Sequence, residues 1–395
     1  MNRRQLLKLA LAAPLALSPL RLFAAPGSNA RVLVVFMRGA YDAANFLVPV
    51  GSDFYYEARP NIAVPRPGSA ANAALPLDAD WALHPALRES LLPLYEKGQL
   101  AFVPFAGTHD VSRSHFGTQD TIELGQAHEG TRDYQSGFLN RLAGVLAKRG
   151  SPIAFTSQLP VTFRGETQIP NIALRQLNKP QVDARQSSMI AQMYRSTPLS
   201  APVNEGFSVR DGVMQELAGE MEAASRNALS ARGFELEARR IARLMRDRFN
   251  VGFVDVGGWD THAGQGGAEG YLANRLEQLG RGVAAFSEEM GGAWRDTVVV
   301  VISEFGRTFR ENGNRGTDHG HGSVYWVLGG SVRGGRVAGE QVRVQASTLF
   351  QNRDYPVLNE YRAMFGGLFA RIYGLDAAQL DRVFPGTPPQ DLGLI

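Results

Sequence analysis

The stretch Arg31-Val32-Leu33-Val34-Val35-Phe36-Met37 is a continuous run of mainly β-branched and apolar residues. It predicts a central strand of a parallel sheet, because strands buried on both faces lack alternating polar positions. Comparable runs follow along the chain, separated by segments with helical periodicity such as 234–249. They cover residues 100–105, 251–256, 296–302 and 324–328. This alternation predicts an α/β fold with a three-layer, mainly parallel sheet and helices on both faces.

The composition limits the kinds of protein this chain can be. It has 395 residues, 44% of them hydrophobic, which is enough to bury a sizeable core. The absence of cysteine excludes thiol catalysis, disulfides, Cys-ligated zinc and iron–sulfur clusters. The formal net charge is +3, but four basic residues lie within the first 21 positions. The rest of the chain is nearly neutral, so nothing indicates a nucleic acid or an anionic membrane as a partner.

The first 25 residues have the order of an export signal. The segment Asn2-Arg3-Arg4-Gln5-Leu6-Leu7-Lys8 resembles a twin-arginine signal, and a weakly apolar stretch leads to Ala24-Ala25. We expect cleavage there and a periplasmic or secreted protein without a transmembrane segment in the mature chain. The alternative is an uncleaved membrane anchor, although the apolar run is short for a spanning helix.

The remainder, residues 30–395, is predicted to form a single domain. Residues 151–206 interrupt the alternating pattern with six prolines, which indicates an inserted irregular subdomain. Helices are expected at 86–96, from residue 114 onward, at 211–227 and at 273–290.

Two short segments concentrate aspartate and histidine. They are Thr-Asp-His-Gly-His-Gly at 317–322 and Trp-Asp-Thr-His at 259–262, each beside a predicted strand. Imidazole nitrogens and carboxylate oxygens are ligands of zinc and manganese. Loops at strand ends are also where α/β proteins build their sites.

Four strand-end loops therefore carry candidate metal ligands. Loops at the carboxyl ends of parallel strands meet at one edge, so their side chains can converge although they are far apart in sequence. Taken singly, each residue has a simpler explanation, since an aspartate after a strand is often a helix cap and a histidine in a turn is often only hydrogen-bonded. The candidate ligands are Asp42, Asp260, His262, Glu304, Asp318, His319 and His321. Together they predict a site for one or two divalent ions, zinc, manganese, calcium or magnesium.

Five short motifs carry a family resemblance. They are Phe-Met-Arg-Gly-Ala-Tyr-Asp-Ala-Ala-Asn at 36–45, Ser-Arg-Ser-His-Phe at 112–116, Gly-Gly-Trp-Asp-Thr-His at 257–262, Ser-Glu-Phe-Gly-Arg-Thr at 303–308 and Gly-Thr-Asp-His-Gly at 316–320. With the leader, they make the whole mature chain resemble the DUF1501 family of exported proteins. That family is similar to the alkaline phosphatase and sulfatase superfamily, whose members hydrolyse phosphate or sulfate esters with one or two metal ions. The resemblance implies an alkaline-phosphatase-like core.

The resemblance also implies roles for the candidate ligands. Asp42 is placed like the first metal carboxylate of the superfamily. Asp260 and His262 resemble its Asp/His pair for one metal, and His319 is placed like the late histidine that completes that shell.

The position of a second metal departs from the superfamily pattern. Glu304 follows a Val-rich strand where the superfamily has an Asp-His pair, and Phe305 stands where that histidine would be. A phenyl ring cannot bind a metal, so the site holds one ion unless Asp318 and His321 compensate.

The nucleophile is expected at the start of a helix, where backbone N–H groups stabilise an anion. Ser114 fits this position best and Ser112 is the alternative, while either can simply cap the helix. Arg113 could hold phosphate oxygens. Arg38 and Arg307 either bind the anion or form ion pairs.

Two functions from different classes remain open. The first is a metal-dependent hydrolase that acts on a small-molecule or polymer ester. The second is a non-catalytic envelope or partner-binding protein on a phosphatase-like scaffold, because a fold does not fix a function. An oxidoreductase is disfavoured, since Gly257-Gly258 lacks the spacing of a dinucleotide-binding fingerprint.

Overall fold

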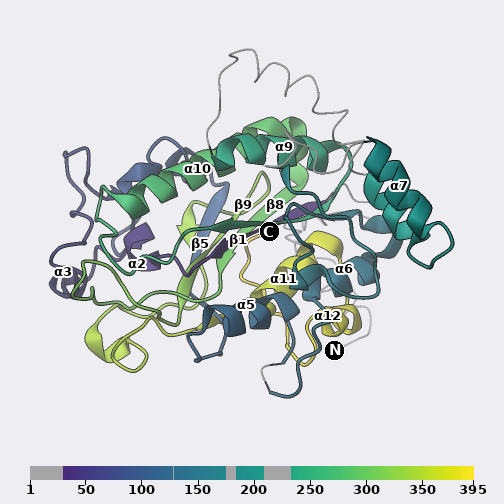
Figure 1. The fold of residues 1–395 in the computed structure, drawn as a ribbon. Coiled ribbons are helices and arrows are strands. Elements are labelled where there is room, and N and C mark those ends of the chain that lie inside the picture. Colours follow the sequence, from purple (N-terminus) through teal and green to yellow (C-terminus); the bar gives the residue numbers. More distant parts are fainter. Residues whose placement is uncertain (1–29, 128, 175–183, 209–232) are drawn as a thin grey trace, which may run out of the picture.

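The computed structural model describes residues 30–127, 129–174, 184–208 and 233–395. At its centre, β1 (Arg31–Arg38) lies between β8 (Thr297–Ser303) and β7 (Val251–Gly257) and is parallel to both (Figure 1). The other strands of this sheet are β5 (Leu100–Gly107), β6 (Pro152–Ala154), β9 (Ser323–Gly329), β10 (Arg336–Val337) and β11 (Asn359–Glu360). The strand order is β10-β5-β9-β8-β1-β7-β6, and β11 also pairs with β5. The predicted inner position of the opening stretch is confirmed.

Strand β9 is antiparallel to both β5 and β8, while β1 is parallel to β7 and β8. The sheet is therefore mainly parallel, as predicted. Because β9 runs the other way, its amino end lies at the edge where β1, β5, β7 and β8 have their carboxyl ends. The loop that precedes β9 thus reaches the same edge as the loops that follow the parallel strands.

Two apolar layers cover the sheet. Leu33, Val35 and Met37 of β1 pack in one core cluster, and Val32, Val34 and Phe36 pack in the other, as the two-residue period of a strand requires. The first layer contains α9 (Phe234–Asp247) and α10 (Tyr271–Met290), and the second contains α6 (Phe138–Leu146), α11 (Tyr361–Tyr373) and α12 (Ala377–Val383) (Figure 1). The three-layer α/β fold is confirmed.

Short elements complete the described chain. A small antiparallel sheet consists of β2 (Leu47–Val48), β4 (Ala82–Leu83) and β3 (Leu75–Pro76). The other elements are α2 (Ala43–Phe46), α3 (Asp53–Ala58), η1 (Pro85–Leu87), α4 (Leu92–Glu96), α5 (His115–Leu124), η2 (Ala147–Arg149), η3 (Val161–Phe163), α7 (Ala184–Tyr194), η5 (Gly291–Asp296) and η6 (Ala346–Thr348). The helix expected over 86–96 is instead η1 followed by α4, and proline lies in the first turn of each, where its missing N–H costs nothing.

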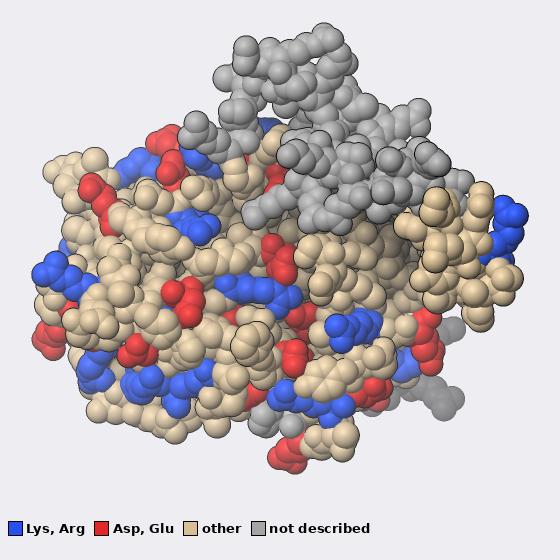
Figure 2. All heavy atoms as spheres, viewed as in Figure 1, with Lys and Arg blue, Asp and Glu red and all other residues tan. Residues whose placement is uncertain are grey.

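Three further predictions concern the segment 151–206, the helix at 211–227 and the twin-arginine leader. Residues 152–154, at the start of the expected insertion, form β6 and pair with β7 of the main sheet. The helix expected at 211–227 and the twin-arginine leader lie outside the described residues. Within the described chain, no helix combines the length and the apolar character needed to cross a membrane. Lys and Arg are interspersed with Asp and Glu over the face shown in Figure 2.

Candidate functional site

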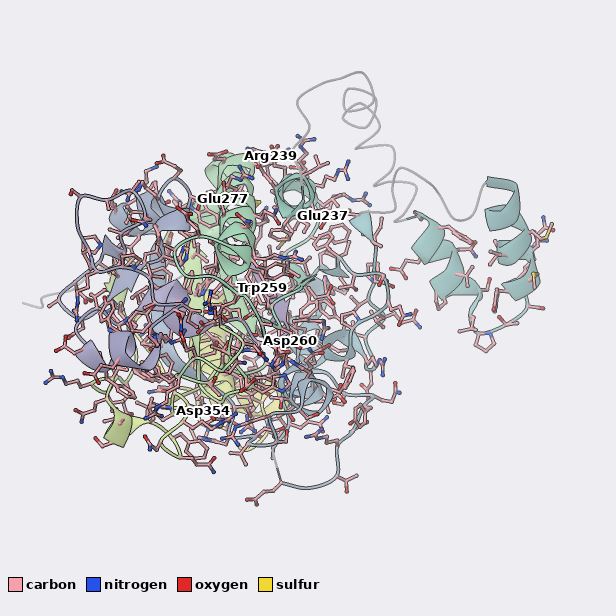
Figure 3. All side chains as sticks on the ribbon, turned by 60° about the vertical axis from the view of Figure 1, so that its left-hand side comes forward. Glu237, Arg239, Trp259, Asp260, Glu277 and Asp354 are labelled. Carbon is pink, nitrogen blue, oxygen red and sulfur yellow. The ribbon has the colours of Figure 1, made fainter. Side chains whose placement is uncertain are left out.

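Three imidazole rings converge on one carboxylate oxygen at the edge of the sheet. Oδ1 of Asp260 lies 2.9 Å from Nε2 of His262, 3.4 Å from Nε2 of His319 and 3.5 Å from Nε2 of His115. The Nε2 atoms of His262 and His319 are 3.1 Å apart. In Figure 3, Asp260 lies next to Trp259 and away from Arg239 and Glu277, which belong to the helices over the sheet.

The other nitrogen of each ring faces a hydrogen-bond acceptor. Nδ1 of His115 is 2.8 Å from Oε1 of Glu304, and Nδ1 of His262 is 3.1 Å from Oδ1 of Asp318. Nδ1 of His319 is 3.0 Å from the backbone carbonyl oxygen of Arg113. A ring that donates from Nδ1 has its lone pair on Nε2, and in that tautomer each of the three rings presents a lone pair beside Oδ1 of Asp260.

The sheet topology explains why these residues meet. His262 follows β7 and Glu304 follows β8, at the carboxyl ends of parallel strands, while His319 precedes the antiparallel strand β9. His115 is the first residue of α5, which follows β5. The strand order therefore brings four separate loops to one edge.

Two glycines allow the loops to approach closely. Gly39 has a φ of 117°, and a Cβ there would lie 2.8 Å from the backbone nitrogen of Asp260. At Gly316 a Cβ would overlap the backbone of His262. Larger residues at either position would push the Asp260–His262 loop away from the cluster.

Charged groups beside the cluster shift the pKa values of its residues. Nη1 of Arg307 donates to Oδ1 of Asp260 at 2.6 Å. Burial alone would raise the pKa of Asp260, but the hydrogen bond and charge of Arg307 outweigh it and lower the pKa below its usual value. The hydrogen bond to Glu304 raises the pKa of His115, whereas burial and the nearby His115 lower the pKa of His319.

Glu304 lies behind the cluster instead of facing it. Its side chain is fully buried, and Oε1 accepts from His115, from the backbone N–H of Gly39 and from Gln119. Burial would raise its pKa, yet these hydrogen bonds lower it, so the carboxylate is ionised. Glu304 therefore orients His115. The ring of Phe305 packs at 5.0 Å from that of His115 and forms an apolar wall beside the site.

Asp42 is not brought into the cluster. Its carboxylate faces Arg59 through contacts of 2.5 and 3.0 Å, and both side chains are almost completely buried. Gln265 also donates to Oδ2 of Asp42 at 2.6 Å. The carboxylate predicted as a metal ligand is thus engaged in a buried ion pair.

A hydrogen-bonded chain nevertheless connects Asp42 with Asp260. Oε1 of Gln265 accepts from the hydroxyl of Thr317, at 3.1 Å, and the Thr317 hydroxyl accepts from Nε of Arg307. Arg307 then reaches Asp260. Asp42 therefore lies at the far end of the network that holds the site's carboxylate.

Two further predicted ligands have different surroundings. Asp318 is half exposed and contacts His262 and Asn312, so it orients a ring. His321 is buried with its ring 4.8 Å from that of Phe350, and burial lowers its pKa to about 4.

The predicted nucleophile and anion-binding residues are also placed. Oγ of Ser114 accepts from the backbone N–H of Gly117 and caps α5, while Oγ of Ser112 lies 3.4 Å from the hydroxyl of Thr118. The guanidinium of Arg113 pairs with Asp354, that of Arg38 with Glu123 and Asp255, and that of Arg307 with Asp260.

His115 belongs to the cluster although it was not predicted as a ligand. It lies in the motif at 112–116 and opens the predicted helix, where the prediction named Ser112, Arg113 and Ser114. A histidine at the start of a helix that follows a strand carried the same positional signal as the other ligands.

Three of these groups are spaced so that they could hold a metal ion, and His262 contacts two of them, Oδ1 of Asp260 at 2.9 Å and Nε2 of His319 at 3.1 Å. His115, Asp260 and His319 each offer one ligand atom within 4.8 Å of the others. Among the described residues, Nε2 of His115 is buried without a hydrogen-bond partner, which a cation would satisfy.

Fold and site together define an α/β protein with a candidate metal centre at the edge of a mainly parallel sheet. The chain belongs to the DUF1501 family, described as protein of unknown function, whose model matches residues 29–384. No curated protein matches the sequence.

Two solved structures describe the likeness of fold. One is a protein in the alkaline phosphatase superfamily from Vibrio parahaemolyticus, with 10% identity and a TM-score of 0.42 over 93% of this chain and 70% of that one. The other is Ps i-CgsB in complex with k-i-k-neocarrahexaose, with 7% identity and a TM-score of 0.39 over 91% and 74% of the two chains.

Proposed function

We propose that this protein is a metal-dependent hydrolase of phosphate or sulfate esters. The observation that carries the proposal is the convergence of three Nε2 atoms on Oδ1 of Asp260, with each Nδ1 held by its own acceptor. Such outer contacts fix the ring orientation and tautomer that a metal ligand needs.

His115, His262, His319 and Asp260 would hold one divalent ion. Three imidazoles favour zinc over calcium and magnesium, which prefer oxygen ligands. When bound, such an ion polarises an ester oxygen and lowers the pKa of a hydroxyl group or water beside it. The phenyl ring of Phe305 argues against a second ion in the same cluster.

With a metal bound, the immediate ligands would support an anionic substrate. A divalent ion held by three neutral rings and one carboxylate would keep one net positive charge, whereas Arg307 is already paired with Asp260 and adds no free charge. Asp260 and His262 are 44% and 45% exposed, so the centre is open to a polymer as well as to a small molecule.

Ser114 is the nucleophile in this proposal. It is exposed, precedes His115 directly and lies at the amino end of α5, where N–H groups face an incoming anion. Ser114→Ala tests this role. A nucleophile would make turnover fall by more than about a hundredfold, whereas a cap alone would change only stability, by about 1 kcal/mol.

A second candidate is a non-catalytic envelope or partner-binding protein on a phosphatase-like scaffold. The pairing of Arg38, Arg113 and Arg307 with carboxylates favours it, because those guanidinium groups are already engaged. Export by the twin-arginine route is common to both candidates. Sequencing the mature N-terminus tests it, and a start at Met1 would contradict cleavage.

The deciding experiment combines elemental analysis with assays on an aryl phosphate and an aryl sulfate. We expect about one equivalent of zinc or manganese in the wild type and turnover of at least one ester. His319→Ala should lose both, while His109→Ala, an exposed histidine outside the cluster, should keep both. Bound metal without turnover of either ester would favour the binding protein. A folded protein that binds no metal and turns over neither ester would reject the hydrolase and favour a binding protein in which the Asp/His loops serve only structural hydrogen bonding.

A further inference from the structure

We infer that Asp354, acting through Arg113, is a positioning residue that holds His319 in the orientation the metal centre needs. The inference rests on the proposed function. It gives Arg113 a role other than the anion binding expected from the sequence, since the backbone of Arg113 reaches the site and its side chain points to Asp354.

Arg113 contacts both His319 and Asp354. Its backbone carbonyl oxygen lies 3.0 Å from Nδ1 of His319. Its guanidinium group donates to Oδ2 of Asp354 from Nε at 3.0 Å and from Nη2 at 2.7 Å, and also contacts Gln351. One residue therefore contacts a candidate ligand with its main chain and a buried carboxylate with its side chain.

The backbone of Arg113 needs such a restraint. Its φ is 53°, in the left-handed region, which a residue with a side chain occupies at a cost of about 1 kcal/mol or more. In this conformation the carbonyl points to His319. The ion pair with Asp354 offsets the cost and keeps the carbonyl in place.

Asp354 is a buried partner for Arg113. Its side chain is 0% exposed, and its main chain exchanges hydrogen bonds with Phe350. It also forms a bridge with Thr308, whose N–H donates to the carbonyl of Asp318, next to His319. Figure 3 places Asp354 on the side of Asp260 away from α9 and α10. Among the described residues, Oδ1 of Asp354 has no hydrogen-bond partner, so Arg113 and Arg353 stabilise this carboxylate through Oδ2 alone.

A positioning role of Asp354 and Arg113 can be distinguished by experiment from a purely structural role. The acceptor for His319 is a backbone atom, so substitution of the Arg113 side chain leaves the acceptor in the molecule and removes only its tether. Loss of the tether should allow the His319 ring to turn or to change tautomer. Outer contacts of this kind are worth about 10–100-fold in metal affinity.

The test uses Arg113→Ala and Asp354→Asn in the full mature protein. Zinc affinity is measured by competition with a chelator, and the tautomer of His319 by NMR of protein labelled with ¹⁵N in histidine. We expect zinc to bind about 10–100-fold more weakly in both variants and the Nδ1–H form of His319 to lose population. Arg113→Lys, which keeps a cation opposite Asp354, should restore most of the affinity.

Asp53→Asn is the matched control, because it removes a carboxylate from an exposed ion pair, with Arg66. Asp354→Asn keeps the shape of the side chain and serves if Arg113→Ala does not fold. Folded variants with zinc affinity within about twofold of wild type and an unchanged His319 tautomer would overturn the inference. If the wild type binds no zinc but both variants lose the Nδ1–H form of His319, the proposed function is refuted and the positioning role stands.

Discussion

Two aspartates that follow neighbouring strands have opposite surroundings in this protein. Asp42 follows β1 and Asp260 follows β7, and these strands are paired. Asp42 is 1% exposed and faces the guanidinium of Arg59. Asp260 is 44% exposed and faces three imidazoles as well as Arg307.

The comparison shows what distinguishes a structural carboxylate from a candidate ligand. Position at a strand end is common to both, so position alone does not decide. Arg59 and Gln265 occupy the carboxylate of Asp42 inside the core, whereas Asp260 pairs with Arg307 but is exposed and also faces three imidazole rings. Exposure and the neighbouring imidazoles separate the two aspartates.

The largest expected effect comes from breaking the buried pair. Arg59→Met leaves the buried carboxyl group of Asp42 without its cationic partner, so the free energy of unfolding should fall by about 3–5 kcal/mol in urea titrations. The double variant Arg59→Met/Asp42→Leu should recover only part of this loss, because it removes both charges but leaves Gln265 and the backbone carbonyl groups of Thr308 and Phe309 without their hydrogen-bond partners. If Asp42→Asn instead abolished metal binding without loss of stability, Asp42 would be a ligand and the comparison would fail.

Removing a cluster histidine should affect metal binding and spare the fold. We expect His262→Ala and His319→Ala each to weaken metal binding by at least about a hundredfold, or roughly 2.8 kcal/mol. Both side chains are partly exposed, so the stability of the metal-free protein should change by only about 0.5 kcal/mol. Unchanged metal content in both variants, measured by elemental analysis, would rule out the site as described.

Gln265 connects the two aspartates and gives a smaller effect. It is fully buried, donates to Asp42 and accepts from Thr261 and Thr317. Gln265→Leu should reduce the free energy of unfolding by about 1–3 kcal/mol, because buried polar partners lose their hydrogen bonds. Gln341→Leu, at an exposed position, should cost less. Equal losses of unfolding free energy in the two variants would show that the hydrogen bonds of Gln265 to Asp42 and Thr317 do not stabilise the protein more than an exposed glutamine does.

Histidines outside the cluster should produce the smallest effect, through pH. Burial lowers the pKa of His84 from 6.5 to about 4, and the same holds for His321. Below pH 6.5 the unfolded chain takes up protons that the folded protein resists, so stability is complete above pH 6.5 and falls as the pH drops towards 4.

The expected loss at pH 5.5 is on the order of 1 kcal/mol for each of these two histidines, relative to pH 7.5. Urea titrations at the two pH values measure it. In the His84→Gln variant, the free energy of unfolding lost between pH 7.5 and pH 5.5 should be smaller by the contribution of His84. An identical loss in wild type and variant would show that the buried ring of His84 does not contribute.

The sheet could be predicted because each of its inner strands can be recognised from its own residues. Runs such as 31–37 and 296–302 are apolar at nearly every position, which only inner strands tolerate. The break between η1 and α4 was missed because helical periodicity over 86–96 hid the turn before Pro93.

The site was predictable in part, since Asp260, His262 and His319 lie in recognisable strand-end loops and do meet. The partner of Asp42 was not predictable, because Arg59 belongs to a stretch without strong periodicity and reaches Asp42 only through the fold. Likewise, nothing local shows that Glu304 and Asp318 face the Nδ1 atoms of histidines instead of a central ion. Such roles depend on side-chain direction, which a single sequence leaves open.

The contact between Arg113 and His319 joins residues 206 positions apart in the chain. Contacts of such separation close large loops, which costs chain entropy and slows folding. The imidazole cluster requires the complete sheet, because its residues lie in loops that follow β5, β7 and β8 and precede β9. A ligand that requires the complete cluster would bind finished molecules and ignore partly folded ones, and by mass action it would draw the population towards the finished state.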